Sequence, residues 1–194
     1  NVRVAGGRTP LHRVGYEPDS RSDPLAAKAA ALLLERGANP NIRDAYGYTP
    51  LFFAAATGYA MVAQVLLEHK AQTDLQEIEN KRTPLMIATL NGHIEVVDTL
   101  LKHGASQKPR DKYGYTALLL AASNAQKTTW REIIMLLLAG AECPIDATDK
   151  TGRTALMYAA HAGAAETVSK LLERGAKAVD IKDANGKTAM TWAT

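Results

Sequence analysis

Cysteine is almost absent from this chain of 194 residues, which contains only Cys143. A single cysteine excludes an internal disulfide and a cysteine-based zinc site, so stability must come from packing. This absence fits a reducing, intracellular compartment, cytoplasmic or nuclear. Aromatic residues make up only 6% of the sequence, and leucine and alanine supply most of the apolar side chains. That composition favours closely packed helices over a large aromatic core.

Strong net charge and long apolar runs are also lacking. The formal net charge is +3, which is too small to predict nucleic-acid binding, although a basic face could lie within a near-neutral total. A steep salt dependence of any DNA or RNA affinity would revive that disfavoured possibility. No apolar run approaches the roughly 18–20 residues of a membrane span, so membrane insertion is not expected.

Three short patterns recur along the chain, with a period of about 33–40 residues. Leu-Leu pairs followed by Gly-Ala or a close variant form one pattern, as in Leu100-Leu101 before Gly104-Ala105. Asp-x-x-Gly forms a second, at Asp44, Asp111, Asp149 and Asp183. Thr-Pro-Leu or a close variant forms the third, at Thr9, Thr49, Thr83, Thr116, Thr154 and Thr188.

Each pattern has a structural reason. Threonine caps a helix and proline suits the first helical position, so Thr-Pro-Leu opens a helix. Alanine pairs such as Ala54-Ala55 let neighbouring helices approach closely. Ile94, Val97 and Leu100 are apolar at helical spacing in a second helix, and Gly104 suits the left-handed position that ends it. Asp-x-x-Gly is a turn. One repeat is therefore a helix, a short link, a helix and an extended finger.

These patterns resemble the ankyrin repeat family over nearly the whole chain. The resemblance implies an all-α fold, a curved solenoid of stacked helix pairs with projecting β-turn fingers. A single repeat cannot bury its own apolar face, and stacking supplies that burial. We expect one domain over residues 1–194, with repeats at approximately 4–43, 44–77, 78–110, 111–148 and 149–182, and a partial repeat at 183–194.

Two helix pairs contain insertions. The first pair has seven extra residues within the polar segment 15–23, and Asp23-Pro24 should restart the helix with a cap and a first-turn proline. The fourth pair has three extra residues around 124–128, and Thr129 with Glu132 has the spacing of a capping box. Either these loops only tolerate extra residues, or they contact a partner.

The third finger and the last repeat depart from the pattern. Lys70 replaces the helix-ending glycine, and Asn80-Lys81 occupies the place of the turn glycine, where asparagine accepts left-handed geometry. This finger should be the most irregular, and Glu77 and Glu79 on it should be solvated. Met190 and Trp192 in the last repeat would be partly uncovered. We expect either a continuing chain or another molecule to cover them.

Residues capable of catalysis do not form a recognisable site. His12 and His93 lie at family positions with structural hydrogen bonding, and His69 and His103 lie in last helical turns, where a cation suits the helix dipole. Cys143 is interpreted as a buried or incidental thiol. No glycine-rich phosphate loop follows a strand. We therefore expect no enzyme activity, cofactor, metal or small-molecule substrate.

The resemblance places partner binding on the finger turns and on the ends of the first helices. The corresponding positions are Tyr46, Tyr48, Thr57, Asn80, Arg82, Leu90, Asn91, Lys112, Tyr113, Tyr115, Ser123, Asn124, Lys150, Thr151, Arg153, His161 and Ala162. We expect six of them to form one continuous surface across fingers two to five, namely Tyr46, Tyr48, Arg82, Tyr113, Tyr115 and Arg153.

Alternating tyrosine and basic residues suit an acidic, partly apolar peptide, because tyrosine and arginine are enriched at interface hot spots. The alternative is that these rings pack on adjoining fingers and stiffen them, and one ring can do both. The sequence therefore predicts a scaffold that binds another protein through its concave face. The alternative function is a regulatory segment of a larger enzyme, channel or transcription regulator.

Overall fold

The computed structural model describes residues 5–16, 23–177 and 179–193. Contacts divide the chain into two compact units, Asn1–Ser106 and Gln107–Thr194, and each is described by itself. The first unit contains a 3-10 helix (Ala5–Gly7), α1 (Pro10–Val14), α2 (Asp23–Glu35), α3 (Pro50–Thr57), α4 (Ala60–Glu68), α5 (Pro84–Asn91) and α6 (Ile94–Lys102). The second contains α7 (Ala117–Ala122), α8 (Thr128–Ala139), α9 (Ala155–His161), α10 (Ala165–Glu173) and α11 (Ala189–Trp192).

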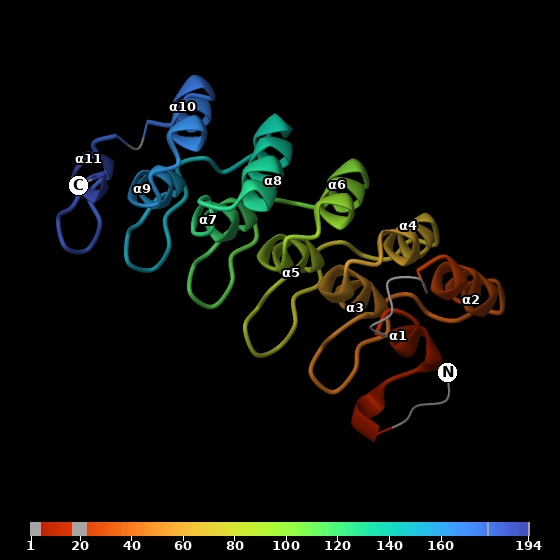
Figure 1. Ribbon diagram of the computed structural model, residues 1–194. Helices are drawn as coiled ribbons and strands as arrows, with labels where there is room; N and C mark the ends of the chain where they lie inside the picture. Colours follow the sequence, from red (N-terminus) through yellow and green to blue (C-terminus); the bar gives the residue numbers. More distant parts are fainter. Residues whose placement is uncertain (1–4, 17–22, 178, 194) are drawn as a thin grey trace. The chain divides into compact units, whose positions relative to one another are not determined.

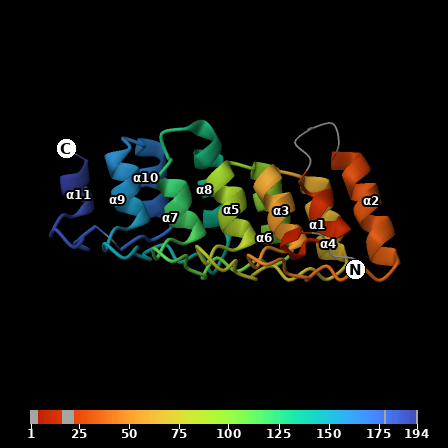
Figure 2. The ribbon, with the colours of Figure 1, turned by 90° about the horizontal axis from the view of Figure 1, so that it is seen from below.

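The expected all-α fold is confirmed. Over the described ranges, β pairing is limited to one isolated antiparallel bridge between Thr148 and Thr154. In the first unit α3 packs on α4 and α5 on α6, while α3 also contacts α1 and α5 in the neighbouring pairs (Figure 1). Figure 2 shows the first helices α1, α3 and α5 side by side. In the second unit α9 contacts α7, α10 and α11 in the same manner.

The first helices begin where the threonine pattern predicts. The hydroxyl of Thr49 accepts a hydrogen bond from the backbone N–H of Phe52 at 3.3 Å, and Thr83, Thr116 and Thr154 cap α5, α7 and α9 in the same way. Thr188 makes no such side-chain bond. Each cap satisfies one of the N–H groups left without a partner at a helix start.

Two predicted caps were wrong. α2 begins at Asp23, where the sequence predicts the helix to restart, but the Asp23 carboxylate accepts from the N–H groups of Met61 at 3.0 Å and Val62 at 3.1 Å. It therefore caps α4 of the neighbouring repeat, because stacking brings the start of α4 to it. Thr129 lies inside α8, which begins at Thr128 after an extended Lys127 without a side-chain cap. Residues 17–22, most of the first insertion, lie outside the described residues.

The core follows the small and branched residues of the repeat. Ala54, Ala55 and Ala159 are fully buried in first helices, as the close approach of neighbouring helices requires. Leu100 on α6 is 0% exposed. Leu101, the second residue of the Leu-Leu pair, is only half-buried. Successive residues lie about 100° apart around a helix, which turns Leu101 partly out of the core.

A buried carboxylate holds the turn of each finger from the second, which begins at Asp44, to the sixth, which begins at Asp183. Asp44 is 6% exposed, and its Oδ1 accepts from the N–H groups of Tyr46 and Tyr48, both at 2.9 Å. Its own N–H donates to the carbonyl of Tyr48 at 3.0 Å. Asp111, Asp149 and Asp183 form the same bonds in the second unit.

The third finger also has a buried carboxylate that accepts hydrogen bonds from the turn, but different residues form it. Glu77 takes the aspartate position and is 1% exposed, so the expectation that it is solvated was wrong. It accepts from the N–H groups of Glu79 and Asn80, both at 2.7 Å. Its longer side chain serves a turn that is one residue longer, since its N–H donates to the carbonyl of Arg82, five residues on. Lys81, not Asn80, adopts the positive φ of 60°.

Truncation of Leu100 should be costly because its side chain is fully enclosed. Leu100→Ala should lower the free energy of unfolding by about 2–5 kcal/mol. Met190 is 72% exposed, so Met190→Ala should change it by less than about 0.5 kcal/mol. Urea titration of both variants measures this difference. Equal losses would contradict the burial on which the prediction rests.

Acid should weaken the fifth finger through Asp149. Burial tends to raise the pKa of Asp149, but hydrogen bonds from Tyr158, Thr151 and Arg153 outweigh burial and leave this pKa below its ordinary value. The stabilisation is therefore complete above the unfolded-state pKa of about 3.9 and is lost as the pH falls through the lower folded-state value. Asp149→Asn should be destabilised at pH 7 and should approach the parent protein near pH 2. Urea midpoints check this, with the exposed Asp180→Asn as a control; a gap independent of pH would refute it.

Candidate functional site

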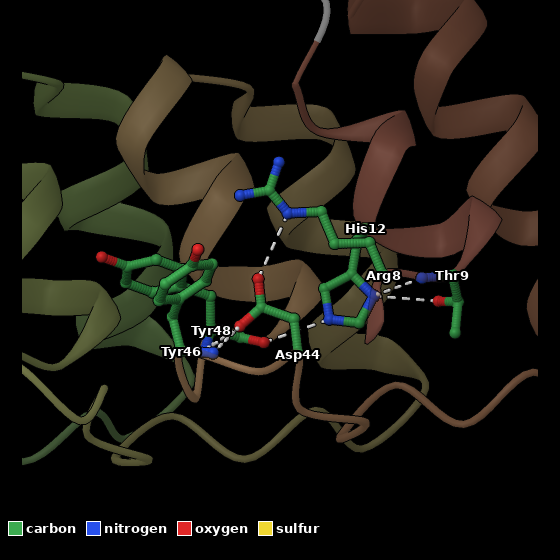
Figure 3. Close-up of polar contacts among 6 residues, drawn as sticks. All are labelled: Arg8, Thr9, His12, Asp44, Tyr46 and Tyr48. Atoms are coloured by element: carbon green, nitrogen blue, oxygen red, sulfur yellow. Dashed lines mark hydrogen bonds and ion pairs between the residues drawn. The ribbon is translucent and has the colours of Figure 1, made fainter. Parts of the chain in front are cut away.

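Figure 3 shows how the second finger is positioned. Arg8 Nε donates to Asp44 Oδ2 at 3.2 Å, and the guanidinium lies 4.8 Å from the centre of the Phe53 ring. His12 Nε2 lies 3.1 Å from the carbonyl oxygen of Tyr48. Burial lowers the pKa of His12, so this ring is neutral at pH 7. The expected structural role of His12 is confirmed.

Tyr46 and Tyr48 occupy alternate positions of this turn and have different surroundings. The Tyr48 ring is half-buried, with its centre 4.6 Å from that of Phe52 and 5.7 Å from that of Phe53. Burial and the nearby carboxylates, Glu77 first, raise the pKa of Tyr48. Tyr46 is 58% exposed. Tyr48 therefore belongs to the packing of the finger, and Tyr46 presents its ring to the outside.

Ile78 was missed in the sequence analysis and lies beside Tyr46. It is 55% exposed, and its N–H donates to the carbonyl of Tyr46 at 3.0 Å. Alignment of Glu77 with the turn aspartates would have placed Ile78 at the fingertip. Asn80 and Arg82 are half-buried on the same finger, and the Asn80 N–H is held by Glu77.

The residues at helix ends of the first unit that the sequence analysis assigns to partner binding connect adjacent repeats. Thr57 Oγ1 donates to the carbonyl of Gly15 at 2.8 Å. Asn91 is exposed, and its amide donates to the carbonyl of Ala56, also at 2.8 Å. Leu90 beside it is half-buried. These side chains leave part of their surface accessible while they tie one first helix to the next.

In the second unit, as in the first, one finger tyrosine is exposed and the other is half-buried. Tyr113 is 49% exposed at the tip of the fourth finger, and the Lys112 ammonium lies 5.0 Å from its ring centre. Tyr115 is half-buried, and its hydroxyl lies 2.6 Å from that of Tyr158. Tyr158 in turn donates to Asp149 Oδ2 at 2.7 Å. Burial, followed by these two hydrogen bonds, raises the pKa of Tyr158, so the hydroxyl stays protonated.

The other selected residues of this unit differ in accessibility. Lys150 and Thr151 are exposed, and the Thr151 hydroxyl donates to Asp149 Oδ1 at 2.7 Å. Arg153 is half-buried. Ser123 and Asn124 both donate side-chain hydrogen bonds to the carbonyl of Leu120 and shape the end of α7. His161 is exposed at the end of α9, with Ala162 half-buried after it.

Trp192 was noted in the sequence only as an uncovered residue of the last repeat. Its ring centre lies 5.1 Å from that of His161, 4.8 Å from the Arg153 guanidinium and 5.1 Å from the Lys187 ammonium. The fifth finger, α9, the sixth finger and α11 supply one side chain each. No short motif signals the cluster, because its members are up to 39 positions apart.

In the described part of the chain, no three or more histidine, cysteine or acidic side chains are grouped to hold a metal. Burial raises the pKa of Cys143 to about 11, so the thiol is protonated at neutral pH and is a poor nucleophile. His93 Nε2 lies 3.1 Å from the Ala56 carbonyl, and His69 and His103 pair with carbonyls of their own helices.

The described segments also contain no helix of the length and apolarity that a membrane span requires.

Comparison with known proteins gives several partial matches. The chain is 40% identical over 82 residues to protein fem-1 homolog A of Danio rerio. This match covers 38% of the chain and 13% of that protein. It is 41% identical over 70 residues to palmitoyltransferase AKR1 of Mortierella alpina, covering 35% and 11%. It is 43% identical over 49 residues to glycerophosphocholine phosphodiesterase GDE1 of Eremothecium gossypii, covering 25% and 4%. The matches span between 4% and 13% of these relatives.

The family comparison covers much more of the chain. The family described as "Ankyrin repeats (3 copies)" matches residues 22–111, 72–143 and 128–194. These overlapping matches include most described helices and all finger turns from Asp44 onward. Together with the repeated helix pairs and the capped first helices, they show that the chain belongs to the ankyrin repeat family.

Proposed function

We propose that the chain binds a partner protein or peptide through its finger turns and the adjoining ends of its first helices. The exposure of Tyr46 and Tyr113 at equivalent positions carries this proposal, at 58% and 49%. Buried Asp44 and Asp111 hold the backbone beneath them. A tyrosine on an ordered backbone offers a large contact area with only two side-chain torsions to restrict.

The residues around the two rings suit an acidic, partly apolar partner. Ile78 adds apolar surface beside Tyr46 in the first unit, and Lys112 and Lys150 add positive charge to the fingers of the second. Tyr48 and Tyr115 hold the fingers from beneath. The proposed rim consists of Thr57, Asn80, Arg82, Leu90 and Asn91 in the first unit, and of Ser123, Asn124, Thr151, Arg153 and His161 in the second.

The proposal includes no catalytic role and places the protein in the cytoplasm or nucleus. A second candidate is a regulatory segment within a larger enzyme. Two relatives favour it, because a phosphodiesterase and a palmitoyltransferase resemble this chain over only 4% and 11% of their lengths. In that case the same finger surface would contact the enzyme's own domains or a regulator of them.

Substitution of the exposed rings should separate binding from folding. With a partner obtained by pull-down, Tyr46→Ala or Tyr113→Ala should weaken binding by about 2 kcal/mol if the ring is an anchor, with little change in melting temperature. Tyr48→Ala should lower the melting temperature, because it removes the packing on Phe52 and Phe53. Calorimetry and thermal unfolding measure the two effects.

Met61→Ala provides a matched control, since Met61 is 50% exposed on the second helix α4. It should leave partner affinity unchanged. Loss of binding in Met61→Ala, combined with normal binding in both tyrosine variants, would move the interface to the second helices and refute the proposal.

A further inference from the structure

We propose that Arg153, His161, Lys187 and Trp192 form an oxyanion-binding cluster in the second unit, which receives a carboxylate or phosphate group carried by a partner side chain. The inference rests on the proposed function, because the anion is taken to be part of the bound protein. It adds Lys187 and Trp192 to the surface and specifies the chemical group recognised there.

Two positive charges lie near one aromatic ring in this cluster. The Arg153 guanidinium and the Lys187 ammonium lie 4.8 and 5.1 Å from the centre of the Trp192 indole. Arg153 precedes α9 and Lys187 precedes α11, so adjacent fingers supply the two cations. Each cation gains from the ring, and an anion that reaches the ring is attracted by both positive charges.

The neighbouring carboxylates of Asp149 and Asp183 already accept several hydrogen bonds each. Asp149 Oδ1 accepts from Thr151 and from the Arg153 N–H, and its Oδ2 accepts from Tyr158. Asp183 Oδ1 accepts from the N–H groups of Asn185 and Lys187, and its Oδ2 accepts from Trp192 Nε1 at 3.2 Å. These hydrogen bonds, led by the one from the Lys187 backbone, lower the pKa of Asp183.

Neither cation has a carboxylate partner at ion-pair distance within the described ranges. Arg153 also pairs with a neutral group, since a hydrogen bond with the Tyr158 hydroxyl raises the pKa of Arg153. Arg153 is half-buried and Lys187 is exposed. They can therefore turn toward an incoming anion without breaking an existing ion pair.

The groups of this cluster suit a side chain that ends in an oxyanion. A guanidinium offers a planar fork for two oxygens, and an ammonium offers a mobile point charge. The indole supplies an apolar wall for the aliphatic stem of a glutamate or for the carbon atoms of a phosphorylated residue. His161 contacts the ring edge-on, with an interplanar angle of 86°, and closes the cluster on the α9 side.

Trp192 provides a direct reporter of occupancy. The chain has two tryptophans, and Trp130→Phe leaves Trp192 as the remaining fluorophore. Over the described residues, the indole nitrogen of Trp130 has no hydrogen-bond partner. The substitution by phenylalanine therefore removes no hydrogen bond. Titration of this protein with hexaglutamate, with inorganic phosphate and with hexaglutamine should change Trp192 emission for one or both anions and leave it unchanged for hexaglutamine.

The two anions distinguish the source of the group. A saturable response to hexaglutamate alone assigns the cluster to carboxylates, and a response to phosphate alone assigns it to phosphorylated residues. Both responses should weaken with added salt, because exposed charges are screened. Absence of a response to either anion would overturn the inference. Partner binding that still depends on Tyr46 or Tyr113 would then show that the proposed function survives without it.

Side-chain variants test the assignment of residues. Lys187→Gln in the Trp130→Phe protein should weaken anion affinity about twofold to fivefold, the range of an exposed ion pair. Lys177→Gln is the matched control, since Lys177 is an exposed lysine outside the cluster, and it should bind normally. Arg153→Gln should weaken binding more, with folding checked by circular dichroism. Equal affinity in the Lys187 and Lys177 variants would overturn the assignment.

Discussion

The buried carboxylate beneath each finger turn from the second to the sixth is the interaction on which the rest of this structure depends. In the second finger one oxygen of Asp44 holds two backbone N–H groups, and the other oxygen accepts from Arg8. The turn is thereby closed without help from its outermost side chains. The side chain of a residue such as Tyr46 is not needed to close the turn. It can therefore contact a partner while the backbone stays in place.

Hydrogen bonds between repeats then extend this local order. The N–H of Ile78 donates to the carbonyl of Tyr46 in the first unit, and the N–H of Lys150 donates to that of Tyr113 in the second. Gly58 shows how close adjacent repeats are, since a Cβ at its left-handed φ of 82° would lie 2.6 Å from the ring of His93. Such contacts replace the large core of a globular domain, because each repeat needs its neighbour for burial.

The sequence predicted most of the fold because its signals are local. Threonine caps, alanine pairs and turn aspartates act within a few residues, so their spacing is enough. Asp23 and Thr129 were misread because a cap can belong to a helix of another repeat or be shifted by an insertion. Which of Tyr46 and Tyr48 faces outward depends on the turn's side-chain directions, and the cluster around Trp192 depends on stacking. Neither property is visible in a motif.

Amide hydrogen exchange in Asp44→Ala tests the central claim most directly. The account predicts faster exchange at the N–H groups of Tyr46 and Tyr48, which lose their acceptor, and at Ile78, whose N–H is bonded to the carbonyl of Tyr46. The amides of α3 and α4 should keep their protection, because their own hydrogen bonds remain. Unchanged exchange at Tyr46 and Tyr48 would contradict the claim that the buried carboxylate holds the finger.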